Sequence, residues 1–435
     1  MEEKMKKLFA ILIAALLVFS LAACGAAPAE KKPAAEGGEA AADDQLLAYV
    51  LCETGETYSQ GLGTYFQQAF EEMGGRVIFE SYPKDSSDFT SYLLKAMDEN
   101  ADVIFAPSST VVAANLLAQA DDKGIEIPIL AGDTWESSVI LDGVKGTDLT
   151  VYCSTFFDEN DESGPAAAFV TGFKEWLNAN PTHFTNNGGN DIVAAVSALG
   201  FDTYNTAYAA IEIALKEKGA DTTSVDIAKA LWQLDITDAV TGSIKFNQDG
   251  DAIKDSAYIK FAGQDGFEFE KVQKVVNNDE QGVAPEYKDE GIKIDGDVIR
   301  IGVYEPQSGM NGAGGKQEIL GILYAHSLKP EIEVDGKVYK IELDIQDNGS
   351  DDVTGKTAAA KLVADKCVVV LGSYGSGVSI AAGDTFEDAA LPAIGCSCTN
   401  PTVTAGRDYY FRICFLDPFQ GSVMAGFSKE IVEGE

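Results

Sequence analysis

Residues 368–401 read VVVLGSYGSGVSIAAGDTFEDAALPAIGCSCTNP, and their pattern indicates the class of fold. The apolar, β-branched run 368–371 is typical of a buried strand. A helix-like segment, 378–389, follows it and leads to a second short strand at 393–394. Strand, helix and strand in this order predict two parallel neighbours in an α/β sheet.

The polar loops that follow these two strands carry hydroxyl groups to one edge of the sheet. The first loop contains Tyr374 and Ser376, and the second contains Ser397 and Thr399. Open α/β sheets bind ligands outside the carboxyl ends of their strands, and the free N–H groups of a helix N-terminus suit a carboxylate. The pattern therefore indicates a small-molecule site, although ordinary turn chemistry between strand and helix explains the same residues.

Two motifs here resemble the ligand-binding edge of the type I periplasmic binding proteins, in particular the branched-chain amino-acid (Leu/Ile/Val-type) branch. They are the glycine-rich loop that ends in Ser376 and Gly377, and Ser-x-Thr-Asn-Pro at 397–401. The resemblance implies that Ser376, and Thr399 with its backbone N–H, hold the α-carboxylate of an amino acid. It also implies that the backbone carbonyl near Ser397 helps to hold the α-ammonium group.

The same resemblance implies further ligand contacts, with Tyr374 in the first loop among them. Tyr58, which opens a helix, matches a tyrosine that faces the ligand cleft. Asp133 stands where the family places an acid against the ligand's ammonium group, and a solvated loop aspartate is the alternative. Trp135 is a candidate pocket wall or a surface aromatic. Phe201 occupies a position where the family often has tyrosine, so a hydroxyl is missing.

Some of the family's aromatic positions carry smaller residues in this chain. These positions are Ser108, Ser109 and Gly314. The departures leave the clamp for the carboxylate and ammonium groups intact and leave the specificity for the ligand's side chain open.

The order of the segments differs from the order in that family. The segment that resembles the family's first part is 298–435, whereas 45–275 resembles its second part. Together they make about one complete two-lobed binding protein, which indicates a circular permutant. A tandem of two truncated family members and a gene-assembly artefact are the alternatives.

The predicted fold is a circularly permuted type I periplasmic-binding-protein fold of two Rossmann-like lobes, each a parallel sheet flanked by helices, with a hinge and a cleft between them. Lobe 1 is predicted from 156–236 and 298–417. Lobe 2 is predicted from 45–155, 237–275 and 418–435, and a linker, 276–297, joins the family's usual termini. A hairpin is also predicted, with strands at 240–246 and 257–262 around a turn at 247–251.

The N-terminus has the pattern of an export signal. Three lysines precede the apolar run 9–22, which is too short to span a bilayer comfortably and ends at Leu-Ala-Ala-Cys24. This resembles the lipobox of bacterial lipoproteins, so residues 1–23 are predicted to be removed and Cys24 to be lipidated. Residues 24–44 are a predicted disordered tether. A plain secretory signal with an incidental cysteine is the alternative.

Composition excludes several classes of function. The chain has 435 residues and a formal net charge of −37, which argues against nucleic-acid binding. With two histidines and no nucleophile beside either of them in sequence, no catalytic or metal constellation is found, so we expect neither an enzyme nor a cofactor. Buried free thiols are expected, with a disulfide as the alternative, at Cys52, Cys153, Cys367, Cys396, Cys398 and Cys414.

These observations predict an extracytoplasmic, lipid-anchored, monomeric solute-binding protein. It would capture an amino acid or a close analogue between two lobes and deliver it to the permease of an ABC transporter. A ligand-sensing receptor module of the same fold, signalling to a partner protein, is the alternative.

Overall fold

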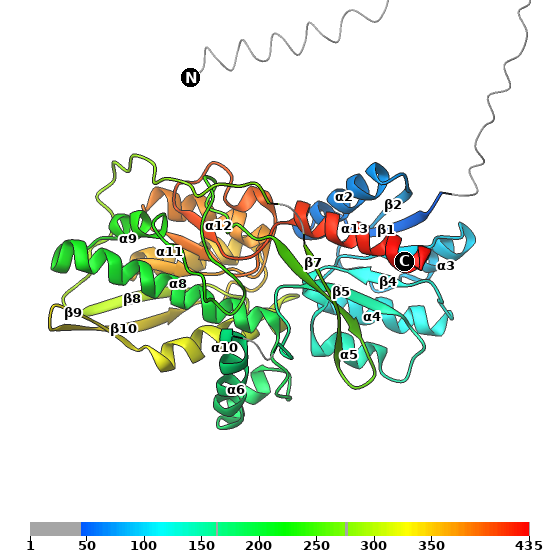
Figure 1. The fold of residues 1–435 in the computed structure, drawn as a ribbon, viewed down its shortest axis with the longest axis horizontal. Coiled ribbons are helices and arrows are strands. Elements are labelled where there is room, and N and C mark those ends of the chain that lie inside the picture. Colours follow the sequence, from blue (N-terminus) through cyan, green and yellow to red (C-terminus); the bar gives the residue numbers. More distant parts are fainter. Residues whose placement is uncertain (1–44, 162–163, 275–276, 435) are drawn as a thin grey trace, which may run out of the picture. The chain divides into compact units, whose positions relative to one another are not determined.

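Two β-sheets, each covered by helices on both faces, organise the chain (Figure 1). The computed structural model describes residues 45–161, 164–274 and 277–434. The predicted signal segment, Cys24 and the tether lie outside these ranges. The predicted α/β class with two sheets flanked by helices is confirmed, although both sheets are mixed rather than wholly parallel. None of the described helices is long and apolar enough to cross a membrane.

The first sheet has the strand order β2-β1-β3-β4-β5-β6-β7. Its strands are β1 (Leu47–Glu53), β2 (Arg76–Tyr82), β3 (Val103–Phe105), β4 (Ile129–Ala131), β5 (Val151–Thr155), β6 (Ser256–Ala262) and β7 (Phe267–Lys274). The first five are parallel, and β6 and β7 add an antiparallel edge. Parallel strands need crossover helices between them, which accounts for the strand–helix alternation in this part of the sequence.

The side chains of β1 alternate between two apolar layers, as the period of a strand requires. Val50 and Cys52 pack in the same cluster as Phe66 of α2 (Thr57–Glu72). Tyr49 and Leu51 point into the other cluster. That second layer contains α3 (Thr90–Asp98), α4 (Thr110–Asp122) and α5 (Ser138–Val144). Burial on both faces explains why the strand reads as a continuous apolar run.

The second sheet has the strand order β13-β12-β11-β8-β10-β9. Its strands are β8 (Val298–Val303), β9 (Glu331–Val334), β10 (Lys337–Ile345), β11 (Val369–Leu371), β12 (Ala393–Gly395) and β13 (Tyr410–Arg412). All neighbours are parallel except β9, which forms an antiparallel hairpin with β10. The two strands predicted from the opening stretch are adjacent and parallel, with Val370 opposite Ala393.

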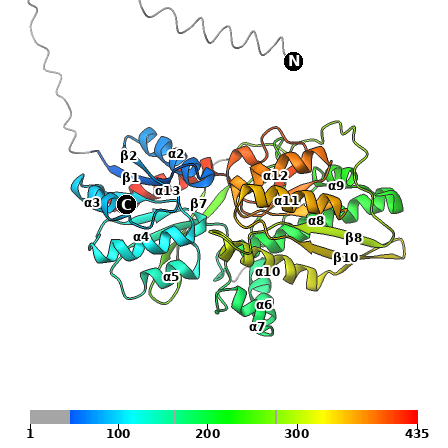
Figure 2. The same cartoon turned by 180° about the vertical axis from the view of Figure 1, so that it is seen from behind.

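Helices cover both faces of the second sheet as well. On one face lie α11 (Asp352–Ala364) and α12 (Ser376–Asp388), which Figure 2 shows on the near side. On the other lie α8 (Ala195–Lys218) and α10 (Gly312–Leu328), which pack tightly on each other. The shorter helices α6 (Gly164–Asn178), α7 (Pro181–Asn186) and α9 (Ser224–Leu231) complete this side.

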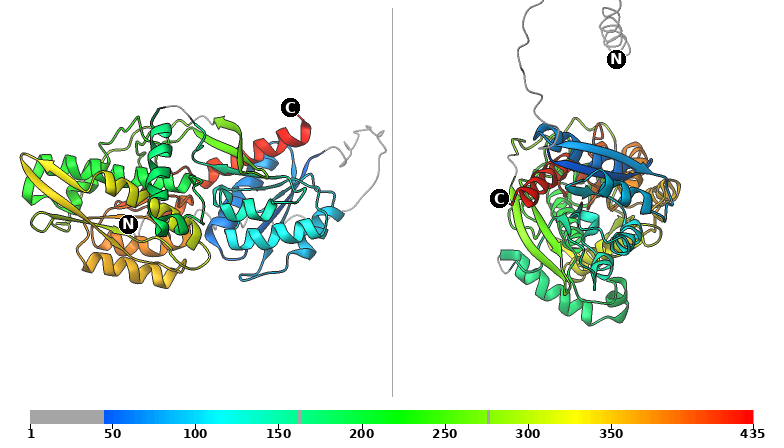
Figure 3. Two further views of the ribbon diagram at one scale, coloured as in Figure 1. Left: turned by 90° about the horizontal axis from the view of Figure 1, so that it is seen from below. Right: turned by 90° about the vertical axis from the view of Figure 1, so that its right-hand side faces the viewer.

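The last helix, α13 (Asp417–Glu433), returns to the first sheet. It packs along α2 and also contacts β4 and β5 (Figures 1 and 3). The C-terminal helix and the N-terminal strand β1 therefore share one layered unit, although almost the whole sequence separates them. Within the described residues, the chain passes between the layers of the two sheets at four places: after β5, α9, β7 and β13.

The predicted hairpin of 240–246 with 257–262 is wrong. Residues 256–262 pair instead with β5 and β7. The strand β7 was not predicted because most of its residues are polar and exposed. The tight turn at 247–251 exists, with the Asn247 N–H donating to the Asp251 carbonyl at 2.8 Å. It is flanked by one isolated antiparallel bridge, between Phe246 and Ala252, and not by a pair of strands.

Residues 240–252 contact the second sheet's layers, although the predicted division grouped them with the first. The N–H groups of Val240 and Thr241 donate to Asp202 of α8 at 3.1 and 2.7 Å. The Ala252 N–H donates to the carbonyl of Arg412 in β13 at 3.0 Å. The described part of the predicted linker also follows this side, since the Ser224 N–H donates to the Ile292 carbonyl at 2.8 Å.

Candidate functional site

A cavity of about 380 Å³ lies at the carboxyl ends of strands from both sheets. Loops after β1, β2, β3 and β4 of the first sheet and after β8, β10, β11 and β12 of the second supply its lining. This is the position at which open α/β sheets bind ligands. A larger cavity, of about 500 Å³, lies beside α6, α8 and α10 away from these strand ends, so we place the candidate site in the smaller one.

Five of the residues predicted for the site line this cavity together. They are Tyr58, Asp133, Tyr374, Ser376 and Ser397. They come from four loops that are up to 339 positions apart in the sequence, so only the fold brings them together.

One wall is built by the start of α12. The helix begins at Ser376, and its N-cap residue, Gly375, has no side chain to satisfy the first N–H groups. Ser376 itself is buried, and its Oγ accepts the N–H of Asn400 at 3.2 Å, which fixes the rotamer and leaves the hydroxyl proton to donate. An uncapped helix N-terminus beside a serine hydroxyl is suited to a carboxylate.

Asp133 lies on the wall that the first sheet contributes. Its Oδ1 accepts hydrogen bonds from the Tyr58 hydroxyl at 3.1 Å and from Nε2 of Gln420 at 2.7 Å, so Oδ2 takes part in neither. Burial raises the pKa of Asp133 to about 6, and the two hydrogen bonds oppose the shift. At neutral pH the group is an anion that lines a cavity, which suits it to an ammonium group. Gln420, which positions it, was not predicted from the sequence.

Thr399 is fully buried and is not part of the cavity lining. Its Oγ1 and both carboxylate oxygens of Asp417 have no hydrogen-bond partner in the described part of the chain. Burial raises the pKa of Asp417 to about 8, and the nearby Thr399 hydroxyl opposes that shift. The carbonyl of Thr399 accepts the Asp417 N–H at 2.9 Å, so this residue ties the β12 loop to the start of α13.

Two predicted contacts lie elsewhere. Trp135 is fully buried in the core between the first sheet and its helices, with Nε1 donating to Ser108 Oγ at 3.2 Å, because its large indole packs inward from a short 3₁₀ turn. Phe201 lines the larger cavity instead and stacks on Tyr324, with ring centroids 5.6 Å apart. Neither side chain lines the candidate site.

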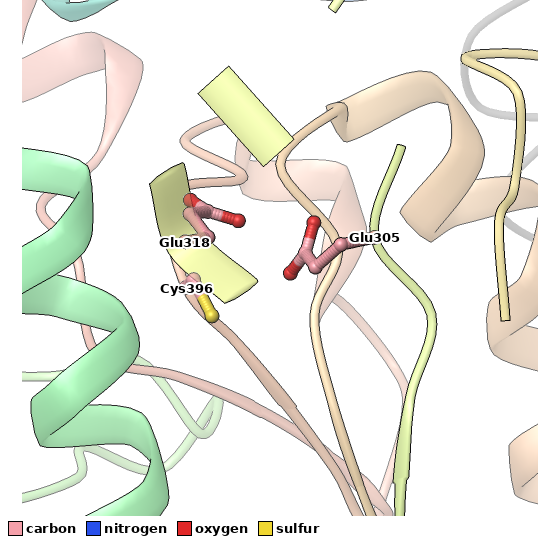
Figure 4. Close-up of side chains that lie close together, drawn as sticks. All are labelled: Glu305, Glu318 and Cys396. Carbon is pink, nitrogen blue, oxygen red and sulfur yellow. The ribbon is translucent and has the colours of Figure 1, made fainter. Parts of the chain in front are cut away.

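Beneath the cavity lies a buried pair of acids that the sequence did not reveal, Glu305 and Glu318. Their carboxyl groups face each other, with the thiol of Cys396 beside them (Figure 4). Glu305 accepts the N–H of Tyr374 at 2.7 Å, and Glu318 accepts the hydroxyl of Ser397. The pair therefore holds two residues of the cavity wall in place.

At least one proton held within this pair accounts for its burial, because two carboxylates in contact in a buried site cannot both be ionised. Burial raises the pKa of Glu305 to about 8, and burial together with the charge of Glu305 raises the pKa of Glu318 as well. One oxygen on each side chain has no other hydrogen-bond partner among the described residues. A glutamate directly before the apolar stretch 319–325 was the available sequence signal.

A profile of the periplasmic binding protein family matches residues 26–265 and 298–431. An amino acid binding protein of Pseudomonas aeruginosa is 31% identical over 143 residues, which cover 32% of this chain and 37% of that protein. A Leu/Ile/Val-binding protein homologue of Brucella abortus is 32% identical over 128 residues, which cover 29% of this chain and 34% of the homologue. The matched segments thus span about a third of the length of these relatives.

Solved structures of similar fold include two amino-acid-binding proteins. A leucine-binding protein from Thermotoga maritima aligns with a TM-score of 0.43 and 24% identity over 52% of this chain and 60% of its own. A branched-chain amino-acid transporter substrate-binding protein from Streptococcus pneumoniae, solved in complex with isoleucine, aligns with a TM-score of 0.40 and 20% identity. The alignment covers 53% of this chain and 60% of that protein. The family is one of substrate-binding proteins rather than enzymes, as the sequence predicted. Since the family profile matches most of its length, the chain belongs to the periplasmic binding protein family.

Proposed function

We propose that this protein captures an L-amino acid or a close analogue in the cavity between the two sheets. One observation carries the proposal: Ser376 at the uncapped start of α12 and the anion Asp133 line the same cavity from different sheets. A zwitterion leaves water at acceptable cost only if both of its charges meet hydrogen-bonding partners. In this proposal Ser376 and the α12 N–H groups hold the carboxylate, and Asp133 holds the ammonium.

The other predicted residues have supporting roles in the proposal. Tyr58 orients Asp133 through its hydroxyl, and Ser397 offers a backbone carbonyl next to the acid pair. Tyr374 forms part of the wall. Thr399 acts from behind the wall, by fixing the β12 loop.

Delivery to an ABC importer and anchoring through Cys24 complete the proposal. Membership of the periplasmic binding protein family implies an extracytoplasmic location. The sequence Leu-Ala-Ala-Cys24 supports the lipid anchor. Closure of the two lobes on the ligand would give the permease a distinct form to recognise.

We also propose that the chain is a circular permutant whose lobe 2 contains the first sheet and whose lobe 1 contains the second. The packing of α13 on α2 supports this, because it joins the two ends of the chain in one layered unit. The described part of 276–297 follows β7 and leads to β8, as a linker between former termini would. In this division residues 240–252 belong to lobe 1 because of their bonds to Asp202 and Arg412.

A thermal-shift screen with the L-amino acids, followed by calorimetry on those that raise the melting temperature, tests the function. Ser376→Ala should weaken binding at least tenfold, whereas Ser422→Ala, an exposed serine on α13, should leave it unchanged. If no L-amino acid or close analogue shifts the melt, the proposed function is wrong.

A further inference from the structure

We propose that the ligand is an amino acid whose side chain carries a second positive charge, and that Glu53 binds that charge. The inference rests on the proposed function, because it concerns the same cavity.

Carboxylates dominate the charged residues of the cavity lining. The acids are Glu53, Glu56, Asp133, Asp351 and Asp352, and the lining cation is Lys84. Glu56 and Asp351 have structural roles, since each accepts two backbone N–H groups as the N-cap of α2 or α11. The acids of the lining that are not caps are Glu53, Asp133 and Asp352, and Asp133 is assigned to the α-ammonium group.

Glu53 is buried and the described part of the fold supplies no partner for its carboxylate, whereas Asp352, which also has none, is exposed to solvent. Glu53 ends β1, the residue is 3% exposed, and within the described ranges no hydrogen bond or ion pair reaches its carboxylate. Burial, and then the charge of Glu56, raise its pKa. Lys84 is close enough to oppose that shift but forms no ion pair with it. A buried carboxylate without a partner is costly, and a ligand cation would remove that cost.

Glu53 and Asp133 line the same cavity from one sheet, at the end of β1 and after β4, with β3 between these two strands. Two carboxylates in one cavity suit a ligand that carries two cations, as lysine and arginine do with their α-ammonium and side-chain groups.

The rest of the lining offers little to a branched aliphatic side chain. Its larger apolar members besides the tyrosines are Met310, Val353 and Val378, and Val353 is 73% exposed. A pocket binds an aliphatic side chain by removing its apolar surface from water against apolar residues. The lining of this cavity consists mostly of residues with hydroxyl or carboxylate groups and of glycines.

Calorimetry with two matched ligand pairs tests the inference: L-arginine against L-citrulline, and L-lysine against L-2-aminoheptanoic acid. Each pair keeps the size of the side chain and removes its charge. We expect the charged member to bind at least tenfold more tightly. Glu53→Gln should reduce this preference to less than threefold, and Glu99→Gln, an exposed acid in the α3–β3 loop, should leave it unchanged.

The outcomes separate the two proposals. If the neutral members bind as tightly or more tightly, the inference is overturned and the proposed function stands. If no amino acid binds, both fail. If the preference is present but survives in Glu53→Gln, the assignment of Glu53 is overturned. The wild-type comparison remains decisive even if Glu53→Gln does not fold.

Discussion

Asp133 is the side chain on which the proposed binding of the ammonium group depends most. Its replacement by alanine leaves a desolvated cation without its charged partner, which typically costs about 2–5 kcal/mol. Calorimetry on Asp133→Ala should show affinity falling by about two orders of magnitude or more. The exposed Asp142→Asn of α5 is the control. An unchanged affinity would place the site or the ligand class elsewhere.

Binding should also depend on pH through the same residue. Its pKa of about 6 in the free protein means that protonation below pH 6 removes the charge the ammonium requires. Affinity should therefore be constant near pH 7–8 and fall towards tenfold per pH unit below pH 6. In Asp133→Asn this dependence should disappear, and a slope that persisted in that variant would assign it to another group.

Individual site residues were predictable where a short motif places them at the end of a strand. Ser376, Ser397 and Asp133 are of this kind, and each lines the cavity. The direction in which a side chain points was not predictable, because it depends on packing. Trp135 is only two residues from Asp133, yet its side chain points into the core. Glu305 and Glu318 were missed because their pairing joins residues from a loop and a helix that have no shared motif.

Among the elements, α8 and α10 approach each other through two glycines. A Cβ on Gly321 would lie 1.9 Å from the Ser197 carbonyl oxygen, and one on Gly200 would lie 2.2 Å from the carbonyl oxygen of Glu318. Gly321→Ala should therefore destabilise the fold by about 1–3 kcal/mol. Gly426→Ala in α13, where a Cβ meets nothing within 4 Å, should stabilise it by about 0.4–1 kcal/mol. Urea unfolding measures both, and equal effects would contradict this packing.

The acid pair between β8 and α10 should make stability fall as pH rises. Folding raises the pKa of Glu305 to about 8, so the folded state binds more protons than the unfolded state from about pH 4.5 to 8. The free energy of unfolding then decreases over this range, by at most about 1.4 kcal/mol per pH unit for each extra proton that the folded pair holds. Asp133 and Asp417, whose pKa values are also raised, add slopes of the same sign.

Glu318→Gln should flatten this pH dependence, because an amide can replace the protonated carboxyl without a charge. Urea unfolding at pH 5, 6.5 and 8 compares it with wild type and with Glu333→Gln, an exposed residue on β9. A slope equal to that of wild type would mean that the pair does not hold the proton.

Elements with strong periodicity were predicted well, and α2 is an example. Its apolar residues recur at helical spacing, and Leu62, Phe66 and Phe70 all face the core. The predicted hairpin failed because alternation in 240–246 reflects contacts of a loop with Asp202 and Phe411 rather than pairing with a strand. Local patterns do not distinguish these two ways of burying alternate side chains.

At the scale of the whole molecule, the proposed permutation can be tested by reordering the two segments of the chain without substituting any residue. A chain that runs 277–434 and then continues through a short flexible linker into 45–274 would restore the family's order and keep the packed residues 277–297. Since α13 and β1 already lie in one layered unit, this chain should fold, bind the same ligand within about threefold, and melt within a few degrees of the original. Failure to fold with several linker lengths would count against the permutation.

The inward turn of Trp135 has an optical consequence. The chain has three tryptophans, and Trp135 lies two positions after Asp133, the proposed ammonium-binding acid. Its side chain is fully buried, and its indole N–H donates to the hydroxyl of Ser108. Its emission should be blue-shifted and sensitive to small displacements of the loop that carries Asp133. With Trp176 and Trp232 replaced by phenylalanine, the tryptophan fluorescence of the protein comes from Trp135 alone. The rate of ligand binding can then be measured from this emission in a stopped-flow instrument, without any attached dye.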